Sequence, residues 1–157
     1  MTEHLPQDSY IEAVADALTS VGLDPADYWT DDCDTRGTYH YLRASFRFTP
    51  EDTHGVDPTR WPDGLLLIWE WHPGIEDCEA EKGAVWLWAK ILPNGSNSSP
   101  APLPVAGAAN PVQVAWSLTE LIDSGQSRRR RVGDWDCAAA LAEDCDTWAE
   151  AEVGGAR

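Results

Sequence analysis

The sequence predicts an α+β domain built on an antiparallel sheet of three to five strands, with a Trp-rich hairpin and helices packed on one face. Three observations lead to this class. Stretches of helical periodicity flank a central region of alternating apolar residues. Two stretches in that region each contain a Trp-x-Trp. The length of 157 residues suits one domain, and we divide it into an α+β unit, 1–126, and an Arg-rich linker with an acidic helix, 127–157, packed on the same domain.

The helices are predicted from apolar residues that recur at spacings of three and four. Residues 8–22 carry such a stripe and end at Gly22, a residue suited to the left-handed conformation of a helix end. A second helix begins at Pro111, where the first turn tolerates proline, and runs to about residue 123. A third, 134–151, has an apolar stripe and an opposite face that carries only acids. Residues 31–37, 49–64 and 93–110 are rich in loop-forming residues and are expected to connect the elements.

The strands are predicted at 38–48, 65–72 and 84–92. The first alternates apolar and polar residues, so one of its faces should meet water. The other two form a hairpin in which each Trp pair lies on one face of its strand, because side chains alternate with a period of two. The paired indoles are Trp69 with Trp71 and Trp86 with Trp88.

The central stretch resembles a small actinobacterial domain of unknown function over about residues 9–123. The motifs that carry the resemblance are Ala-Val-Ala-Asp-Ala-Leu, Gly-Leu-Asp-Pro-Ala-Asp-Tyr-Trp, Leu-Leu-Leu-Ile-Trp-Glu-Trp, Ala-Val-Trp-Leu-Trp-Ala and Pro100-Ala-Pro102. It implies a compact α+β domain and no catalytic residues. The helix–sheet–helix order is also similar to secretion-chaperone-like folds, which bind proteins. The scarcity of lysine beside abundant Ala, Asp, Gly and Arg is typical of a GC-rich genome.

Charge restricts the class of partner. The 27 Asp and Glu against 11 Lys and Arg give a net charge of −16. Such a field repels nucleic acid and anionic lipid, so we expect neither direct nucleic-acid binding nor membrane binding. It favours a basic or nucleic-acid-binding protein as partner. The chain begins without a signal-peptide pattern and contains no long apolar run, so a cytoplasmic protein with reduced thiols is expected.

No catalytic or metal-binding motif is recognised. Cys33, His40, His72 and Cys78 match no ligand spacing. The acids at 31, 32 and 34 lack the Gly and closing Glu of a calcium loop. The remaining thiols lie on an acidic helix, where negative neighbours disfavour a thiolate. We therefore expect no cofactor and no metal, and we favour a non-enzymatic role while leaving enzymatic activity undecided.

Two groups of residues are candidates for binding. The first is aromatic, since nine Trp and four Tyr could form an exposed face that takes up a protein or a second copy in a homodimer. The second is a basic run that either pairs with nearby acids of the chain or binds an acidic partner. The candidates are Tyr39, Tyr41, Trp69, Trp71, His72, Trp86, Trp88, Arg128, Arg129, Arg130 and Arg131.

The sequence thus favours an acidic protein-interaction domain. A specific version is a mobile-element or phage-type inhibitor whose acids mimic the phosphates of DNA. The alternative is a small-ligand-binding domain or enzyme with a pocket between the sheet and residues 93–110. The residues expected to line such a pocket are Tyr39, Tyr41, His72, Trp69 and Trp71.

Overall fold

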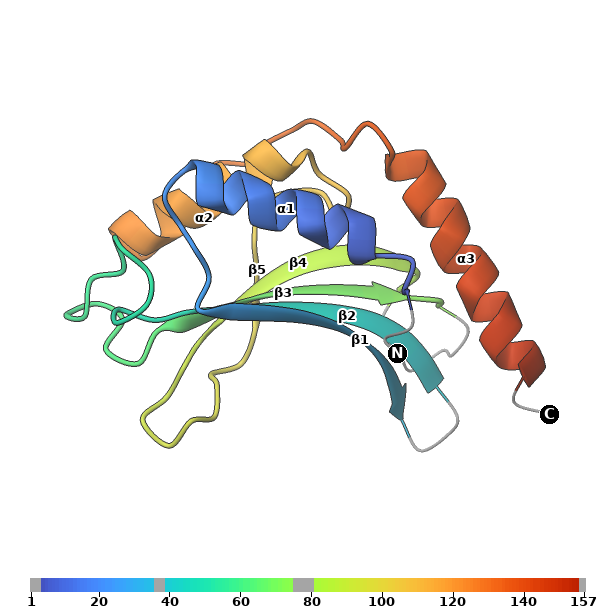
Figure 1. Cartoon of the computed structure of the whole chain (residues 1–157), viewed down its shortest axis with the longest axis horizontal. Coiled ribbons are helices and arrows are strands. Elements are labelled where there is room, and N and C mark those ends of the chain that lie inside the picture. The colour runs from blue at the N-terminus through green and yellow to red at the C-terminus, as the bar shows by residue number, and fades with distance from the viewer. Residues whose placement is uncertain (1–3, 36–38, 75–80, 156–157) are drawn as a thin grey trace.

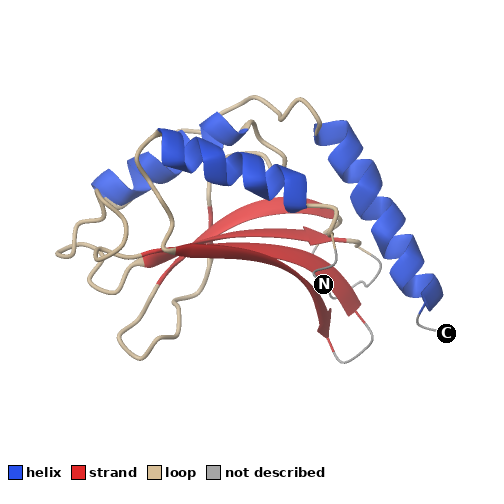
Figure 2. Cartoon of the chain, in the orientation of Figure 1, coloured by secondary structure: helices blue, strands red, loops and turns tan. Residues whose placement is uncertain are grey.

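The computed structural model describes residues 4–35, 39–74 and 81–155. The described residues form one five-stranded antiparallel sheet and three helices, which confirms the predicted α+β class (Figures 1 and 2). The elements are, in chain order, α1 (Asp8–Ser20), β1 (Asp27–Thr35), β2 (Tyr39–Phe48), β3 (Leu65–His72), β4 (Gly83–Lys90), β5 (Ala101–Pro102), α2 (Pro111–Ser124) and α3 (Ala138–Gly155).

The sheet is a meander in which each strand pairs with its neighbours in the chain, in the order β1-β2-β3-β4-β5. The register places Trp69 opposite Trp86 and Leu67 opposite Trp88. The predicted Trp-rich hairpin is therefore present, with its indoles on the face that the helices cover. The opposite face of the sheet, called here the open face, carries the alternate residues of each strand.

The first strand was not predicted. Residues 31–37 are expected from their composition to form a loop, but β1 runs to Thr35 and pairs with β2 along its whole length. Aspartate has a low strand propensity, yet pairing with a neighbouring strand outweighs such a local preference. Tyr28, Trp29 and Thr30 are residues that strands favour, and they lie near its start.

The helices α1 and α2 lie side by side over one face of the sheet (Figure 1). Between them and the sheet lies a continuous core. Tyr10 is fully buried there; its hydroxyl donates to the Ala109 carbonyl at 2.7 Å and accepts the indole N–H of Trp86 at 3.2 Å. This residue therefore ties α1 both to the sheet and to the segment that precedes α2.

The helix α3 crosses the end of the sheet rather than lying flat on it (Figure 2). It begins at Ala138, four residues later than predicted. Leu141 and Cys145 are buried in the same core as α1 and α2, and Asp146 forms an ion pair with Lys82 at 2.8 Å. None of the described helices is long and apolar enough to cross a membrane.

Candidate functional site: an acidic groove between α1 and β1

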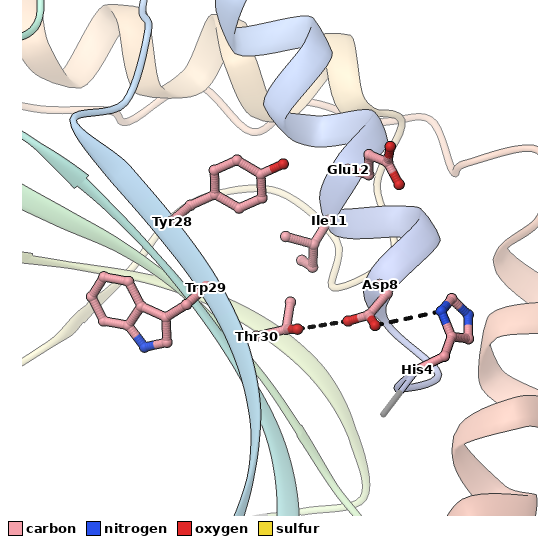
Figure 3. A pocket seen from close by; sticks show the side chains of 7 residues that line it. All are labelled: His4, Asp8, Ile11, Glu12, Tyr28, Trp29 and Thr30. Atoms are coloured by element: carbon pink, nitrogen blue, oxygen red, sulfur yellow. Dashed lines mark hydrogen bonds and ion pairs between the residues drawn. The ribbon is translucent and has the colours of Figure 1, made fainter. Parts of the chain in front are cut away.

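A groove separates α1 from the edge strand β1, and it consists of two hollows. One has a volume of about 420 Å³ and the other about 500 Å³. Tyr28 lines both, so we treat them as one feature, the α1–β1 groove. Figure 3 shows the first of the two hollows. Its lining residues are His4, Asp8, Ile11, Glu12, Ala15, Asp16, Thr19, Asp24, Pro25, Ala26, Asp27, Tyr28, Trp29 and Thr30.

Hydrogen bonds fix the two walls of the groove at the start of α1. Thr30 donates from its hydroxyl to a carboxylate oxygen of Asp8 at 2.6 Å (Figure 3). The side-chain amide of Gln7 donates to the backbone carbonyl oxygens of Asp31 and Arg43 at 3.2 and 3.1 Å. Because Gln7 is fully buried, these bonds hold the helix at a set position relative to β1 and β2.

The groove has a strongly acidic lining. It contains five carboxylates and neither Lys nor Arg. Arg47 on β2 pairs with Asp27 at 2.9 Å, and His4 lies 3.5 Å from Asp8. Within the described part of the chain, no cation pairs with the remaining three lining carboxylates, which belong to the exposed residues Glu12, Asp16 and Asp24.

Two exposed aromatic side chains lie on β1 beside this groove, one on each face of the strand. Tyr28 is 43% exposed and points to the α1 side of β1, where its ring stacks on Phe46 with a centroid separation of 5.3 Å. Trp29 is 42% exposed and points to the other side of the strand (Figure 3). Large exposed aromatic residues in an acidic setting are typical of binding surfaces. From the sequence alone, Tyr28 and Trp29 could equally pack their rings against the sheet, so their exposure is a finding of the structure.

The Trp pairs of the hairpin do not form a binding surface. Trp69 and Trp86 are fully buried, and Trp71 is nearly so. The indole of Trp69 donates to the Gly107 carbonyl at 2.8 Å. Trp88 is half-buried and packs edge-on against the ring of Trp61. The four indoles fill the space between the sheet and the helices, so the aromatic face considered in the sequence analysis belongs to the core.

Tyr41 and His72 lie on the open face, away from these indoles. Their rings stack with a centroid separation of 4.8 Å, and a ring nitrogen of His72 lies 2.9 Å from a carboxylate oxygen of Glu70. The side chain of Tyr39 is not among those that the structure describes. Because adjacent residues of β3 point to opposite faces, Trp71 and His72 do not line one pocket. The structure therefore does not bring the indoles of Trp69 and Trp71 together with Tyr41 and His72.

The thiol of Cys33, which lies opposite Tyr41 on the neighbouring strand, is poorly suited to nucleophilic chemistry. Cys33 donates to the carboxylate of Asp31 at 3.3 Å. Burial, with a contribution from Asp31, raises the pKa of the Cys33 thiol. Burial and then Cys33 raise the pKa of Tyr41 to about 12. Since a nucleophilic cysteine requires a lowered pKa, this arrangement does not favour a thiolate.

A smaller cavity lies between the sheet, the segment before α2 and α3. Its volume is about 250 Å³, below the size usual for small-molecule sites. The lining contains no titratable side chain; it consists of Trp71, Gly83, Ala84, Gly107, Ala108, Ala138, Leu141 and Ala142. Its side chains are apolar apart from the indole of Trp71, so they offer little that could orient a substrate.

The basic run is divided between a packed and an exposed part. Arg131 pairs with Glu120 of α2 at 3.3 Å, and its guanidinium lies 5.8 Å from the ring centre of Trp116. Arg128, Arg129 and Arg130 are exposed. Among the nearby acids with which the run could pair, those between β3 and β4 lie largely in 75–80, outside the described residues. Asp146 of α3 pairs with Lys82.

The comparisons and the metal-ligand geometry add no further assignment. Among the described residues, no group of three His, Cys, Asp or Glu side chains is placed to hold a metal ion. Of the four residues considered as metal ligands in the sequence, Cys78 lies outside the described residues. Comparison of the chain with family models, with curated proteins and with solved structures found no match.

Proposed function

We propose that the protein is a non-enzymatic interaction domain whose α1–β1 groove binds a basic surface of another protein. The observation that carries this proposal is the acidic lining of the groove next to the exposed rings of Tyr28 and Trp29. Carboxylates attract a basic partner over distance and raise its association rate. Exposed aromatic side chains supply the contact area that charge alone does not.

The more specific DNA-mimic version is not part of this proposal. Asp8, Glu12 and Asp16 recur every four residues, so each carboxylate follows the last by about 6 Å along α1. A DNA strand carries a phosphate about every 3.4 Å along its axis. The single row on α1 is therefore only about half as dense as one strand, and a basic protein surface is the simpler match.

The test is a capture experiment with two charge-matched variants. The groove variant carries Glu12→Gln, Asp16→Asn and Asp24→Asn. The control variant neutralises three exposed acids of α3 through Glu143→Gln, Asp144→Asn and Glu150→Gln. Both raise the net charge by the same amount, so they differ only in where the charge is removed.

Each tagged protein is incubated with a lysate of the organism that encodes it, at low and at high salt, and the retained proteins are identified by mass spectrometry. We expect a basic protein that the unmodified domain and the α3 control retain at low salt and release at high salt. The groove variant should bind it about tenfold more weakly, because three exposed charge pairs at about 0.5 kcal/mol each amount to that factor. Equal retention by the two variants would refute the groove as the binding site.

A further inference from the structure

The strand β1 is the long open edge of the sheet. It stands first in the strand order, and no described residue pairs with its outer side. The other edge is covered: Ser98 donates its backbone N–H to the Lys90 carbonyl, Leu103 donates to the Trp86 carbonyl, and β5 pairs with β4 between them. An unpaired edge strand offers a row of backbone N–H and C=O groups to another extended chain.

The side chains beside this edge differ on its two faces. On the α1 side lie Tyr28 and the unpaired carboxylates of the groove. On the open face lies Trp29, between Asp27 and Asp31, whose charges are paired with those of Arg47 and Arg43 on β2. The register neighbours of Trp29 across the sheet are uncharged: Ser45, Ile68 and Leu87. A chain added at the edge would alternate its side chains between these two surroundings. Basic residues would face the groove, and apolar residues would contact Trp29.

Charge argues against a second copy as the added strand. β1 contains Asp27, Asp31, Asp32 and Asp34, and like charges placed opposite each other across two strands are destabilising. Charged edge strands are a known protection against edge-to-edge pairing of identical chains. The same charges attract a basic chain, so the edge discriminates between the two.

We propose that an extended basic segment of a partner protein adds to the sheet as a further strand beside β1, with its basic side chains facing the α1–β1 groove and its apolar side chains facing Trp29. This inference rests on the proposed function and specifies how the partner is held. The partner then needs a stretch of about five to eight residues that alternates basic and apolar side chains.

The test uses synthetic peptides, so that the identity of the natural partner is not needed. The probe is a capped, fluorescently labelled peptide of about eight residues in which Lys and Val alternate. A block isomer with all Lys before all Val carries the same charge and composition. Two further peptides have the alternating sequence with methylated backbone nitrogens, one at every Val and the other at every Lys. In an extended chain alternate N–H groups point to opposite sides, so only one of these two peptides loses the donors that face β1.

Affinities are measured by fluorescence anisotropy at low ionic strength with the full chain. We expect the alternating peptide to bind about tenfold more tightly than its block isomer, and one methylated peptide to bind about tenfold more weakly than the other. Trp29→Ser should weaken binding of the alternating peptide and leave the block isomer unchanged. Equal affinities of the two methylated peptides would overturn strand addition.

The two proposals fail in different ways. If the groove variant weakens binding of the alternating peptide while the methylated peptides bind equally, the acidic groove is a binding site and strand addition is wrong. If the groove variant and the α3 control weaken binding to the same degree, the peptide responds only to net charge, and the proposed function fails as well.

Discussion

The buried hydroxyl of Tyr10 allows a quantitative test of how the layers are joined. In Tyr10→Phe the ring remains, so the apolar contacts with the sheet are kept. The variant loses the acceptor of the Trp86 indole N–H and the donor to the Ala109 carbonyl. A buried polar group left without its partner costs about 1–3 kcal/mol. For two such groups we expect the free energy of unfolding to fall by about 2–6 kcal/mol.

Urea unfolding monitored by circular dichroism measures this loss. With a slope of about 2 kcal/mol per molar urea for a domain of this size, the midpoint should fall by about 1–3 M. Tyr28→Phe is the matched control, because its side chain is 43% exposed and its change should stay within about 0.5 kcal/mol. A Tyr10→Phe midpoint indistinguishable from that of the control would refute the reasoning that the hydroxyl joins α1 to the segment before α2.

The same side chain predicts a dependence on alkaline pH. Burial raises the pKa of Tyr10 well above its ordinary value of 10.0. The unfolded chain therefore loses this proton first, at about pH 10, while the folded chain keeps it. The stabilising contribution is complete below pH 10 and is lost as the pH rises from 10 toward the folded pKa. The decline of stability above pH 10 should be shallower in Tyr10→Phe than in the unmodified protein.

Three further outcomes are expected. Gly107→Ala should lower the free energy of unfolding by about 2–3 kcal/mol in urea, because a Cβ there would overlap the backbone carbonyl of Ala84; stability equal to that of the unmodified protein would contradict this contact. Cys145 should resist alkylation in the folded state, because burial and then its acidic neighbours raise its pKa to about 12. The exposed Cys137 should react. Peptide mass mapping after brief iodoacetamide treatment measures both, and equal labelling of the two thiols would contradict the burial of Cys145. Leu141→Ala should cost about 2–4 kcal/mol and reduce hydrogen-exchange protection in α3 before the sheet; simultaneous loss in both would show that α3 does not open separately.

Strong periodicity made much of the fold predictable. The sides of α1 and α2 that face the sheet carry apolar residues at helical spacing, and these are buried. Pro111 begins α2 as expected, and the helix ends next to Gly125, which adopts the left-handed conformation at φ 82°. β3 and β4 are predictable from the sequence because their large apolar and aromatic residues fit a pleated surface better than they fit a helix.

The edge strand and the groove could not be predicted, because their signals are tertiary. β1 is half acidic, and only its pairing with β2 makes it a strand. Which face of β3 and β4 the helices cover is not encoded in Trp-x-Trp; the indoles are buried because Trp69 and Trp86 reach partners at Gly107 and Tyr10. Tyr28 and Trp29 have no periodic pattern around them, so the sequence does not predict that their side chains are exposed.

The meander also fixes the order in which the chain can become a folded protein. Each strand pairs with its neighbour in sequence, so the strand contacts are local in the chain and can form early. The helix layer is different, because α1 packs on α2, whose residues lie near the other end of the chain. During synthesis the apolar face of the sheet therefore stays incompletely covered until Ser124 has left the ribosome. Over that interval the nascent chain presents its Trp-rich surface to solvent, and this is the stage at which it is most exposed to misassembly.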